Sequence, residues 1–79
     1  MTIQFFLRLK DLTGSAAIDY KIDGETTVCS LLASLYRDFP ELEKWDAHIL
    51  VAVGVEYVGR DYVLNNSDVV SIMPPVQGG

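Results

Sequence analysis

Apolar and polar residues alternate along the first ten positions of the chain. Within "MTIQFFLRLK", one face of the segment carries Ile3, Phe5, Leu7 and Leu9. A period of two residues over this length is typical of a strand with one buried face. After "DLTGS", which is rich in turn-forming residues, the stretch "AAIDYKI" alternates again. We therefore expect these two strands to form an antiparallel hairpin.

The hydrophobic period changes near residue 28. Thr27 stands where a helix N-cap is expected, and Pro40 stands where a helix stops. The segment between them has the i, i+3, i+4, i+7 spacing of an amphipathic helix. We expect the following "ELEKWD" to be a short irregular or single-turn segment. The apolar positions of the predicted helix are Val28, Leu31, Leu32, Leu35 and Phe39.

The second half of the chain contains further strand-like stretches. "HILVAVGV" is nearly all apolar and rich in branched residues, which predicts a strand buried on both faces and central in its sheet. "EYVGRDYVLNNSD" carries short strand-like pieces and a polar turn. In the last strand, "VVSIMP", Val70 and Ile72 face one way and Met73 faces the other. At Gly54-Val55 we expect a type II′ turn, because only its first position needs a positive φ.

The predicted order is strand, strand, helix, strand, short strand, strand. It indicates an α+β fold in which one helix crosses a mixed sheet. With the first and last strands as central neighbours, this is the order of the β-grasp, or ubiquitin-like, fold. We expect residues 1–75 to form this domain and residues 76–79 to form a flexible C-terminal tail ending in Gly-Gly.

Composition and charge narrow the function. The 79 residues are 49% hydrophobic and 22% charged, which fits one folded domain. The longest apolar run is too short to span a bilayer, no signal peptide is apparent, and the single cysteine suits a reducing compartment. We therefore expect a cytoplasmic protein without a membrane partner. The net charge of −5 disfavours nucleic acid and favours a partner with a basic docking surface.

The body of the predicted domain offers little catalytic chemistry. His48 is the only histidine, and no cysteine pair has ligand spacing, so a metal site is unsupported. Cys29 has no histidine placed to act as its base, and we expect it to be a small buried hydrophobe. We expect neither an active site nor a bound cofactor in the body. A solvated acidic rim is predicted from Asp38, Glu41, Glu43 and Asp46.

The last six residues, "PPVQGG", are the candidate functional segment. Pro74 and Pro75 favour a stiff, extended exit from the last strand. The four residues after them reach about 13 Å when stretched. Since glycine has no Cβ, Gly78 and Gly79 can pass through a tunnel that any side chain would block. Such a tail would deliver its terminal carboxylate into another protein's active site, where activation as an acyl-adenylate makes it an acyl donor.

Three stretches together resemble a known family, the MoaD-type sulfur carriers that form the small subunit of molybdopterin synthase. "FFLRLKDLTG", "LVAVGVEYV" and "PPVQGG" stand in the family's order and spacing, and the likeness covers essentially the whole chain. The double proline before Gly-Gly is the most specific of these features, since thiazole-synthesis sulfur carriers are shorter and lack it.

The resemblance implies a reaction cycle for a carrier that is not itself a catalyst. An E1-like enzyme would use ATP to adenylate Gly79, and a sulfur donor protein would supply the sulfur of a thiocarboxylate. The tail would then enter the large synthase subunit and pass sulfur to cyclic pyranopterin monophosphate, building the dithiolene of molybdopterin. In the family, two small and two large subunits form a heterotetramer.

The resemblance also implies a docking surface. Phe6 and Met73 face outward on their predicted strands, where apolar side chains need a partner. Family interface positions match Phe6, Tyr57 and Met73, with a basic residue at Lys10. We expect the large subunit to contact these residues together with the tail residues Pro74, Pro75, Val76 and Gln77.

Two alternatives use the same tail. A ubiquitin-like modifier would form isopeptide bonds with lysines, and a sulfur carrier of another pathway, such as thiazole synthesis, would pass its sulfur elsewhere. A binding domain with an inert tail fits poorly with an unextended Gly-Gly end.

Overall fold

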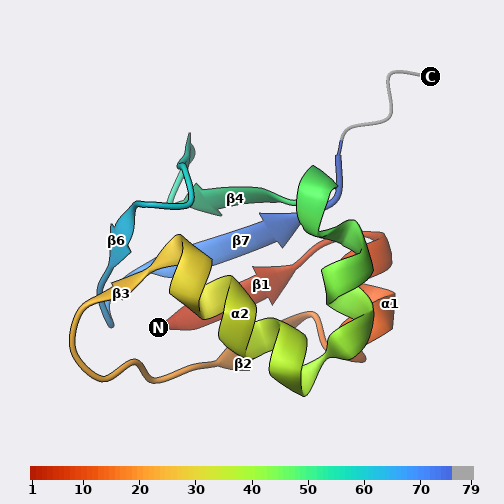
Figure 1. The fold of residues 1–79 in the computed structure, drawn as a ribbon, viewed down its shortest axis with the longest axis horizontal. Helices are drawn as coiled ribbons and strands as arrows, with labels where there is room; N and C mark the ends of the chain where they lie inside the picture. The colour runs from red at the N-terminus through yellow and green to blue at the C-terminus, as the bar shows by residue number, and fades with distance from the viewer. Residues whose placement is uncertain (76–79) are drawn as a thin grey trace.

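The computed structural model describes residues 1–75, which form a sheet crossed by a helix (Figure 1). Within this range the sheet has five strands in the order β2-β1-β7-β4-β5. A separate two-stranded ribbon pairs β3 with β6. The strands are β1 (Thr2–Phe5), β2 (Ala17–Asp19), β3 (Thr26–Thr27), β4 (Leu50–Val53), β5 (Glu56–Tyr57), β6 (Val63–Leu64) and β7 (Val69–Met73). The helices are α1 (Arg8–Thr13), α2 (Val28–Asp38) and the 3₁₀ segment η1 (Pro40–His48).

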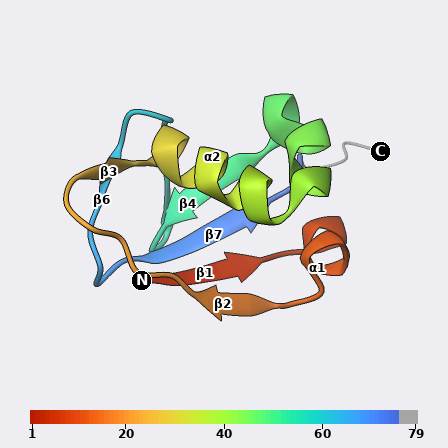
Figure 2. The same ribbon diagram turned by 60° about the horizontal axis from the view of Figure 1, so that its bottom comes forward.

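The centre of the sheet is the parallel pair β1 and β7, in which Ile3 lies opposite Val70. The remaining pairs are antiparallel: β2 with β1, β4 with β7, and β5 with β4. The helix α2 crosses one face of this sheet, as the two ribbon views show together (Figures 1 and 2). The predicted α+β architecture, with its first and last strands as central neighbours, is confirmed.

The core lies between α2 and the sheet. The helix contributes its predicted apolar stripe, and alternate residues of β1 and β7 face it from the sheet. Each fully buried aliphatic side chain of this kind stabilises the fold by about 1.5–3 kcal/mol. The least exposed of these residues are Ile3, Val28, Leu31, Leu32, Leu35, Val70 and Ile72.

The helix α2 starts where the sequence predicts. Thr27 Oγ1 accepts a hydrogen bond from the Ser30 N–H at 3.2 Å, which satisfies one of the free donors of the first turn. At the other end the Phe39 N–H donates to the Leu35 carbonyl. The Phe39 ring also packs edge-to-face on Phe5, with centroids 6.0 Å apart, so the end of α2 is fastened to β1.

The first strand is shorter than predicted. It ends at Phe5, and α1 begins at Arg8, so the alternation across residues 3–9 is not one strand. The chain turns at Leu7, where φ is +56°. Leu9 is nevertheless fully buried, because the helix rather than a strand directs it into the core. The predicted inward position of Leu7 is wrong, since this side chain is 73% exposed.

The middle of the chain also departs from expectation. β4 lies second from the edge of the sheet, and β7 is the central strand. Only Val51 and Ala52 of β4 are buried, while Leu50 is exposed. The segment expected to make a single turn is the nine-residue η1, and His48 ends η1 instead of opening a strand. Gly54 has the positive φ that the predicted turn requires at its first position, +63°. The φ of Val55 is not positive, as expected for the second position of that turn.

The second predicted strand is also short, because β2 stops at Asp19. The chain beyond it is held by a side chain distant in sequence. Asn66 accepts a hydrogen bond from the Ile22 N–H through Oδ1 and donates to the Ile22 carbonyl through Nδ2, both at 3.1 Å. A side-chain amide thus satisfies the backbone of a residue that has no strand partner.

Candidate functional site

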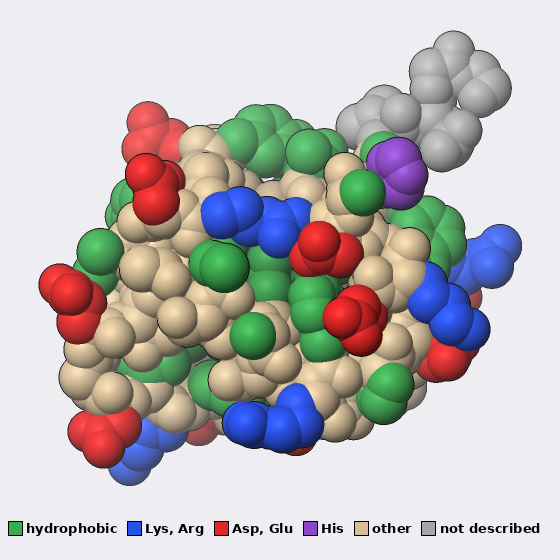
Figure 3. Space-filling view, viewed as in Figure 1, with side chains coloured by type: hydrophobic (Ala, Val, Ile, Leu, Met, Phe, Trp, Pro, Cys, Tyr) green, Lys and Arg blue, Asp and Glu red, His purple; other side chains and the backbone are tan. Residues whose placement is uncertain are grey.

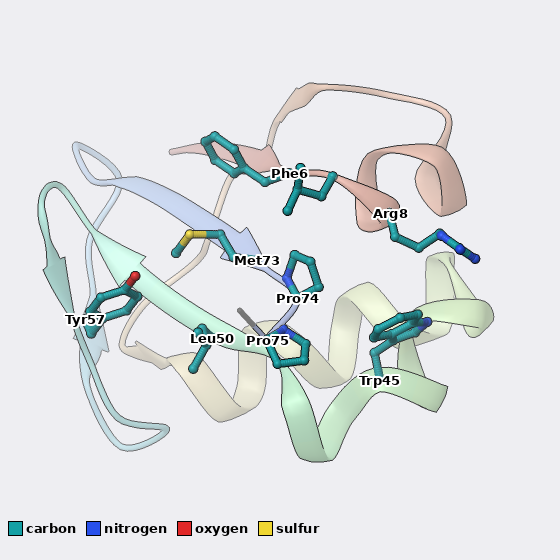
Figure 4. Close-up of a pocket in the computed structure, with 9 residues that line it drawn as sticks. Phe6, Arg8, Trp45, Leu50, Tyr57, Met73, Pro74 and Pro75 are labelled. Atoms are coloured by element: carbon teal, nitrogen blue, oxygen red, sulfur yellow. The ribbon is translucent and has the colours of Figure 1, made fainter. Parts of the chain in front are cut away.

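An apolar groove of about 650 Å³ lies beside the point where the chain leaves β7 (Figure 4). Met73 points into it from β7, with the opposite orientation to the buried Ile72. The groove is therefore on the face of the sheet turned away from α2. Its lining residues are Phe6, Leu7, Arg8, Trp45, Leu50, Tyr57, Met73, Pro74 and Pro75.

Three strands of the same sheet bring the three predicted interface residues to this groove. Phe6 follows β1, where its N–H donates to the Ile72 carbonyl at 3.1 Å. Tyr57 comes from β5, and Met73 from β7. Phe6 is 41% exposed and Tyr57 is 66% exposed. Large apolar side chains so accessible on one groove are typical of an interaction surface.

The two prolines connect the groove to the C-terminal tail. Pro74 is buried and Pro75 is half-buried, and both line the groove at the end of β7. The predicted tail residues Val76, Gln77, Gly78 and Gly79 lie outside the described residues. The described part of the chain therefore ends at the groove, with four residues still to follow.

The basic residue on the groove is Arg8. Lys10, the predicted cation, is exposed on α1 and lines a smaller adjoining hollow. Phe6 and Leu7 line both depressions, so the two adjoin each other. Neither Arg8 nor Lys10 forms an ion pair within residues 1–75.

Four lining residues were not predicted from the sequence: Leu7, Arg8, Trp45 and Leu50. Leu7 and Arg8 are displaced by the turn that ends β1 early. That turn places Leu7 at φ +56° and ψ −129°, a region that costs a residue with a Cβ on the order of 1–3 kcal/mol. Leu50 lies opposite Met73 in the sheet register, so correct pairing of the last two long strands would have located it.

The carboxylates at the end of α2 and in η1 do not all have the same environment. Asp38, Glu41 and Glu43 are exposed, as predicted for a solvated rim. Asp46 instead accepts a hydrogen bond from the Tyr36 hydroxyl and one from Arg60. Those bonds hold the pKa of Asp46 below its ordinary value, and burial with the same bond raises the pKa of Tyr36. Figure 3 shows acidic and basic side chains interspersed over the face that carries α2.

Other sequence-based candidates add no site. Cys29 is exposed, which corrects the predicted burial: it lies about 100° around the helix from Val28, outside the buried stripe. His48 is exposed as well. Among residues 1–75 no group of three potential metal ligands gathers. No helix in the same range has the length and apolar character to cross a membrane.

The mixed sheet crossed by α2, with β1 and β7 parallel at its centre, defines a ubiquitin-like β-grasp protein. The sequence profile of the ThiS family matches residues 3–79. The chain belongs to that family.

Two relatives and one solved structure show which kinds of protein the chain is similar to. The chain is 35% identical over 81 residues to a "Molybdopterin synthase sulfur carrier subunit" of Dictyostelium discoideum, covering 98% of this chain and 93% of the relative. It is 29% identical over 90 residues to "Small archaeal modifier protein 3" of Haloferax volcanii, covering 100% and 98%. The crystal structure of SAMP1 from Haloferax volcanii superposes with a TM-score of 0.85 at 29% identity, covering 100% and 98%.

Proposed function

We propose that this protein is the sulfur carrier subunit of a molybdopterin synthase. The observation that carries the proposal is the apolar groove gathered where the chain leaves the sheet toward Gly78-Gly79. A surface of this kind suits tight binding of a partner protein, and a tail that follows Pro75 suits delivery of a terminal group into that partner. The similarity to the Dictyostelium sulfur carrier supports the same role.

In the proposed cycle, an E1-like enzyme first activates the C-terminus. The Gly79 carboxylate attacks the α-phosphate of ATP, and pyrophosphate leaves. Hydrosulfide released by a donor protein then attacks the carbonyl and displaces AMP, so that a C–S bond replaces the acyl C–O bond to AMP and a thiocarboxylate is formed. Because Gly78 and Gly79 have no side chains, the nucleotide and the nucleophile have room to approach the Gly79 carbonyl. ATP is used by the activating enzyme, and the carrier itself needs no cofactor.

The large synthase subunit then binds the groove and receives the tail. Phe6, Tyr57 and Met73 are the proposed anchors, since buried aromatic and apolar side chains carry most of the binding energy in interfaces. Arg8 on the groove and Lys10 on the adjoining hollow would meet acidic groups of the partner. Within a complex of two small and two large subunits, the thiocarboxylate sulfur attacks cyclic pyranopterin monophosphate, and hydrolysis of the resulting thioester leaves the sulfur on the pterin and restores the Gly79 carboxylate. Two such deliveries build the dithiolene.

A second candidate function is protein modification. It is favoured by the full-length similarity to the small archaeal modifier proteins. A modifier would form an isopeptide bond between the activated Gly79 carbonyl and a lysine. Its β-grasp body and tail would be the same, so the two functions differ only in the nucleophile that accepts the acyl group.

Intact-mass spectrometry after co-expression with an E1-like enzyme and a large subunit tests the proposal. We expect one oxygen of the carrier to be exchanged for sulfur, and we expect the product to convert the pterin precursor when mixed with the large subunit. Ladders of lysine adducts would instead indicate the modifier. A thiocarboxylate that leaves the pterin precursor unchanged would indicate a carrier of another pathway, such as thiazole synthesis.

A further inference from the structure

Three side chains that the proposed chemistry does not use form a cluster behind one wall of the groove. The Tyr36 hydroxyl donates to Asp46 Oδ1 at 2.5 Å, and Arg60 Nη1 donates to the same oxygen at 3.0 Å. Arg60 Nη2 also donates to the main-chain carbonyl of Asp46 at 2.6 Å. Both the side chain and the backbone of Asp46 are therefore held, and Trp45, which lines the groove, is its neighbour in the chain.

Arg60 joins three parts of the fold. Its main-chain carbonyl accepts a hydrogen bond from the Cys29 N–H at 2.8 Å, which anchors it to the start of α2. Its side chain reaches η1 through Asp46, and it follows β5, which carries Tyr57. In Figure 4, Tyr57 and Trp45 lie at opposite ends of the groove. The Arg60 contacts thus link η1, which carries Trp45, to the segment that follows β5, which carries Tyr57.

The hydrogen bonds of Asp46 add to the packing of η1 against the core, in which Trp45 also takes part. The segment η1 has nine residues, whereas 3₁₀ helices seldom exceed three or four because their hydrogen bonds are poorly aligned. Its one fully buried side chain is Leu42. The ion pair between Lys44 and Glu41 lies within η1 itself and does not connect the segment to the rest of the molecule.

We propose that Arg60, with Asp46 and Tyr36, is a positioning residue of the docking groove: it holds η1 so that Trp45 forms the groove wall beside Pro75. The inference rests on the proposed role of the groove in binding a partner. Arg60 itself does not line the groove, so its effect on binding passes through Trp45.

Fluorescence of the free protein tests the first half of the proposal, because Trp45 is the only tryptophan in the chain. Arg60→Ala should shift Trp45 emission to longer wavelength and make acrylamide quenching more efficient, with the secondary structure retained by circular dichroism. Arg60→Lys should give an intermediate change, because a lysine cannot make both Arg60 bonds in the same fork. The matched control is Lys44→Ala, which removes the internal ion pair of η1 and should leave the emission unchanged.

Tyr36→Phe provides a milder variant that removes one hydrogen bond and keeps the ring. It should move the Trp45 emission in the same direction as Arg60→Ala. Wild-type emission and quenching in both variants would overturn the proposal. This measurement needs no partner, so it separates a failure of the positioning role from a failure of the proposed function, which would appear as a wild-type protein that does not bind the large subunit.

A double-mutant cycle with the large subunit tests the second half. Arg60→Ala should weaken binding about tenfold, as loss of an interface anchor does. The same substitution should have little effect in a Trp45→Ala background, because the residue that it positions is already absent. An equal loss of affinity in both backgrounds would mean that Arg60 contacts the partner directly, and the proposal would be wrong.

Discussion

At the scale of single residues, the backbone conformation of Leu7 leads to a prediction about stability. It adopts a positive φ of +56° and is 73% exposed, so it gains little from burial to offset its conformation. Leu7→Gly should raise the free energy of unfolding by about 1 kcal/mol, because glycine adopts this region without a Cβ clash. Urea denaturation measures the change. Leu50→Gly, on the same groove but within β4, should have the opposite effect, and a Leu7→Gly protein less stable than wild type would contradict the argument.

A second residue-scale prediction concerns the groove floor. Met73→Asp should weaken binding of the large subunit by about 2 kcal/mol or more if Met73 is a central anchor. Calorimetry measures the affinity. Val69→Asp is the matched control: Val69 is on the same outward side of β7 and is 44% exposed, but it does not line the groove. Equal losses in the two variants would show that the groove is not the docking surface.

The tail provides the third residue-scale prediction. Gly78→Ala should sharply slow adenylation and sulfur transfer, because the added methyl group clashes in a narrow channel and penalises positive φ. The melting temperature should hardly move. ATP–pyrophosphate exchange with the activating enzyme measures the first step, and Gln77→Ala serves as a control with a neighbouring side chain shortened. Wild-type exchange by Gly78→Ala would mean that the terminal glycines are not needed for passage.

At the scale of elements, the attachment of η1 to α2 should depend on pH. The Tyr36 hydroxyl and then Arg60 lower the pKa of Asp46 from its ordinary 3.8, while Glu43 is the other nearby charge that acts on Tyr36. A carboxyl group with a lowered folded-state pKa stabilises the fold above its unfolded pKa, and this contribution is lost as the pH falls through the folded value. Below about pH 4, the wild-type protein should therefore lose stability.

Asp46→Asn isolates this contribution. The variant should be less stable than wild type near neutral pH, and the difference should shrink in acid because wild-type Asp46 becomes protonated there. Unfolding by urea at both pH values gives the comparison, and Glu43→Gln serves as the control for a neighbouring exposed carboxylate. A gap between wild type and Asp46→Asn that stays constant with pH would contradict the assignment.

At the scale of the whole molecule, the β-grasp domain carries a C-terminal tail whose length matters. Four residues beyond Pro75 extend about 13 Å, and the proposed chemistry needs a free carboxylate at that distance. Adding one residue after Gly79 should abolish adenylation and leave the melting temperature unchanged. Adding one serine after Glu25, in the exposed loop before β3, should leave adenylation intact. An extended chain that mass spectrometry shows to be untrimmed, yet is still adenylated, would refute this prediction.

The sequence by itself determined the fold class, the helix α2 and the residues that face one another across the core. These features depend on local periodicity. The 3.6-residue spacing of apolar residues from Val28 to Leu35 indicates a helix, and the two-residue alternation in β7 indicates a strand. The capping role of Thr27 is equally local. The sequence also indicated that Phe6, Tyr57 and Met73 share a surface. For Phe6 and Met73 the signal was their outward position together with the family resemblance, and for Tyr57 it was the resemblance alone.

Only the tertiary structure decided where the first strand ends, which residues complete the groove, and what holds η1. Alternation across residues 3–9 fits a strand, yet Leu9 also fits the buried side of α1, and packing against the rest of the core selects the helix. Leu50 reaches the groove through its register with Met73. Arg60 and Asp46 are separated by 14 positions, and no short-range pattern predicts a hydrogen bond between them. Contacts of this kind depend on chain segments that meet only after folding, and for that reason they have no signature in the local sequence.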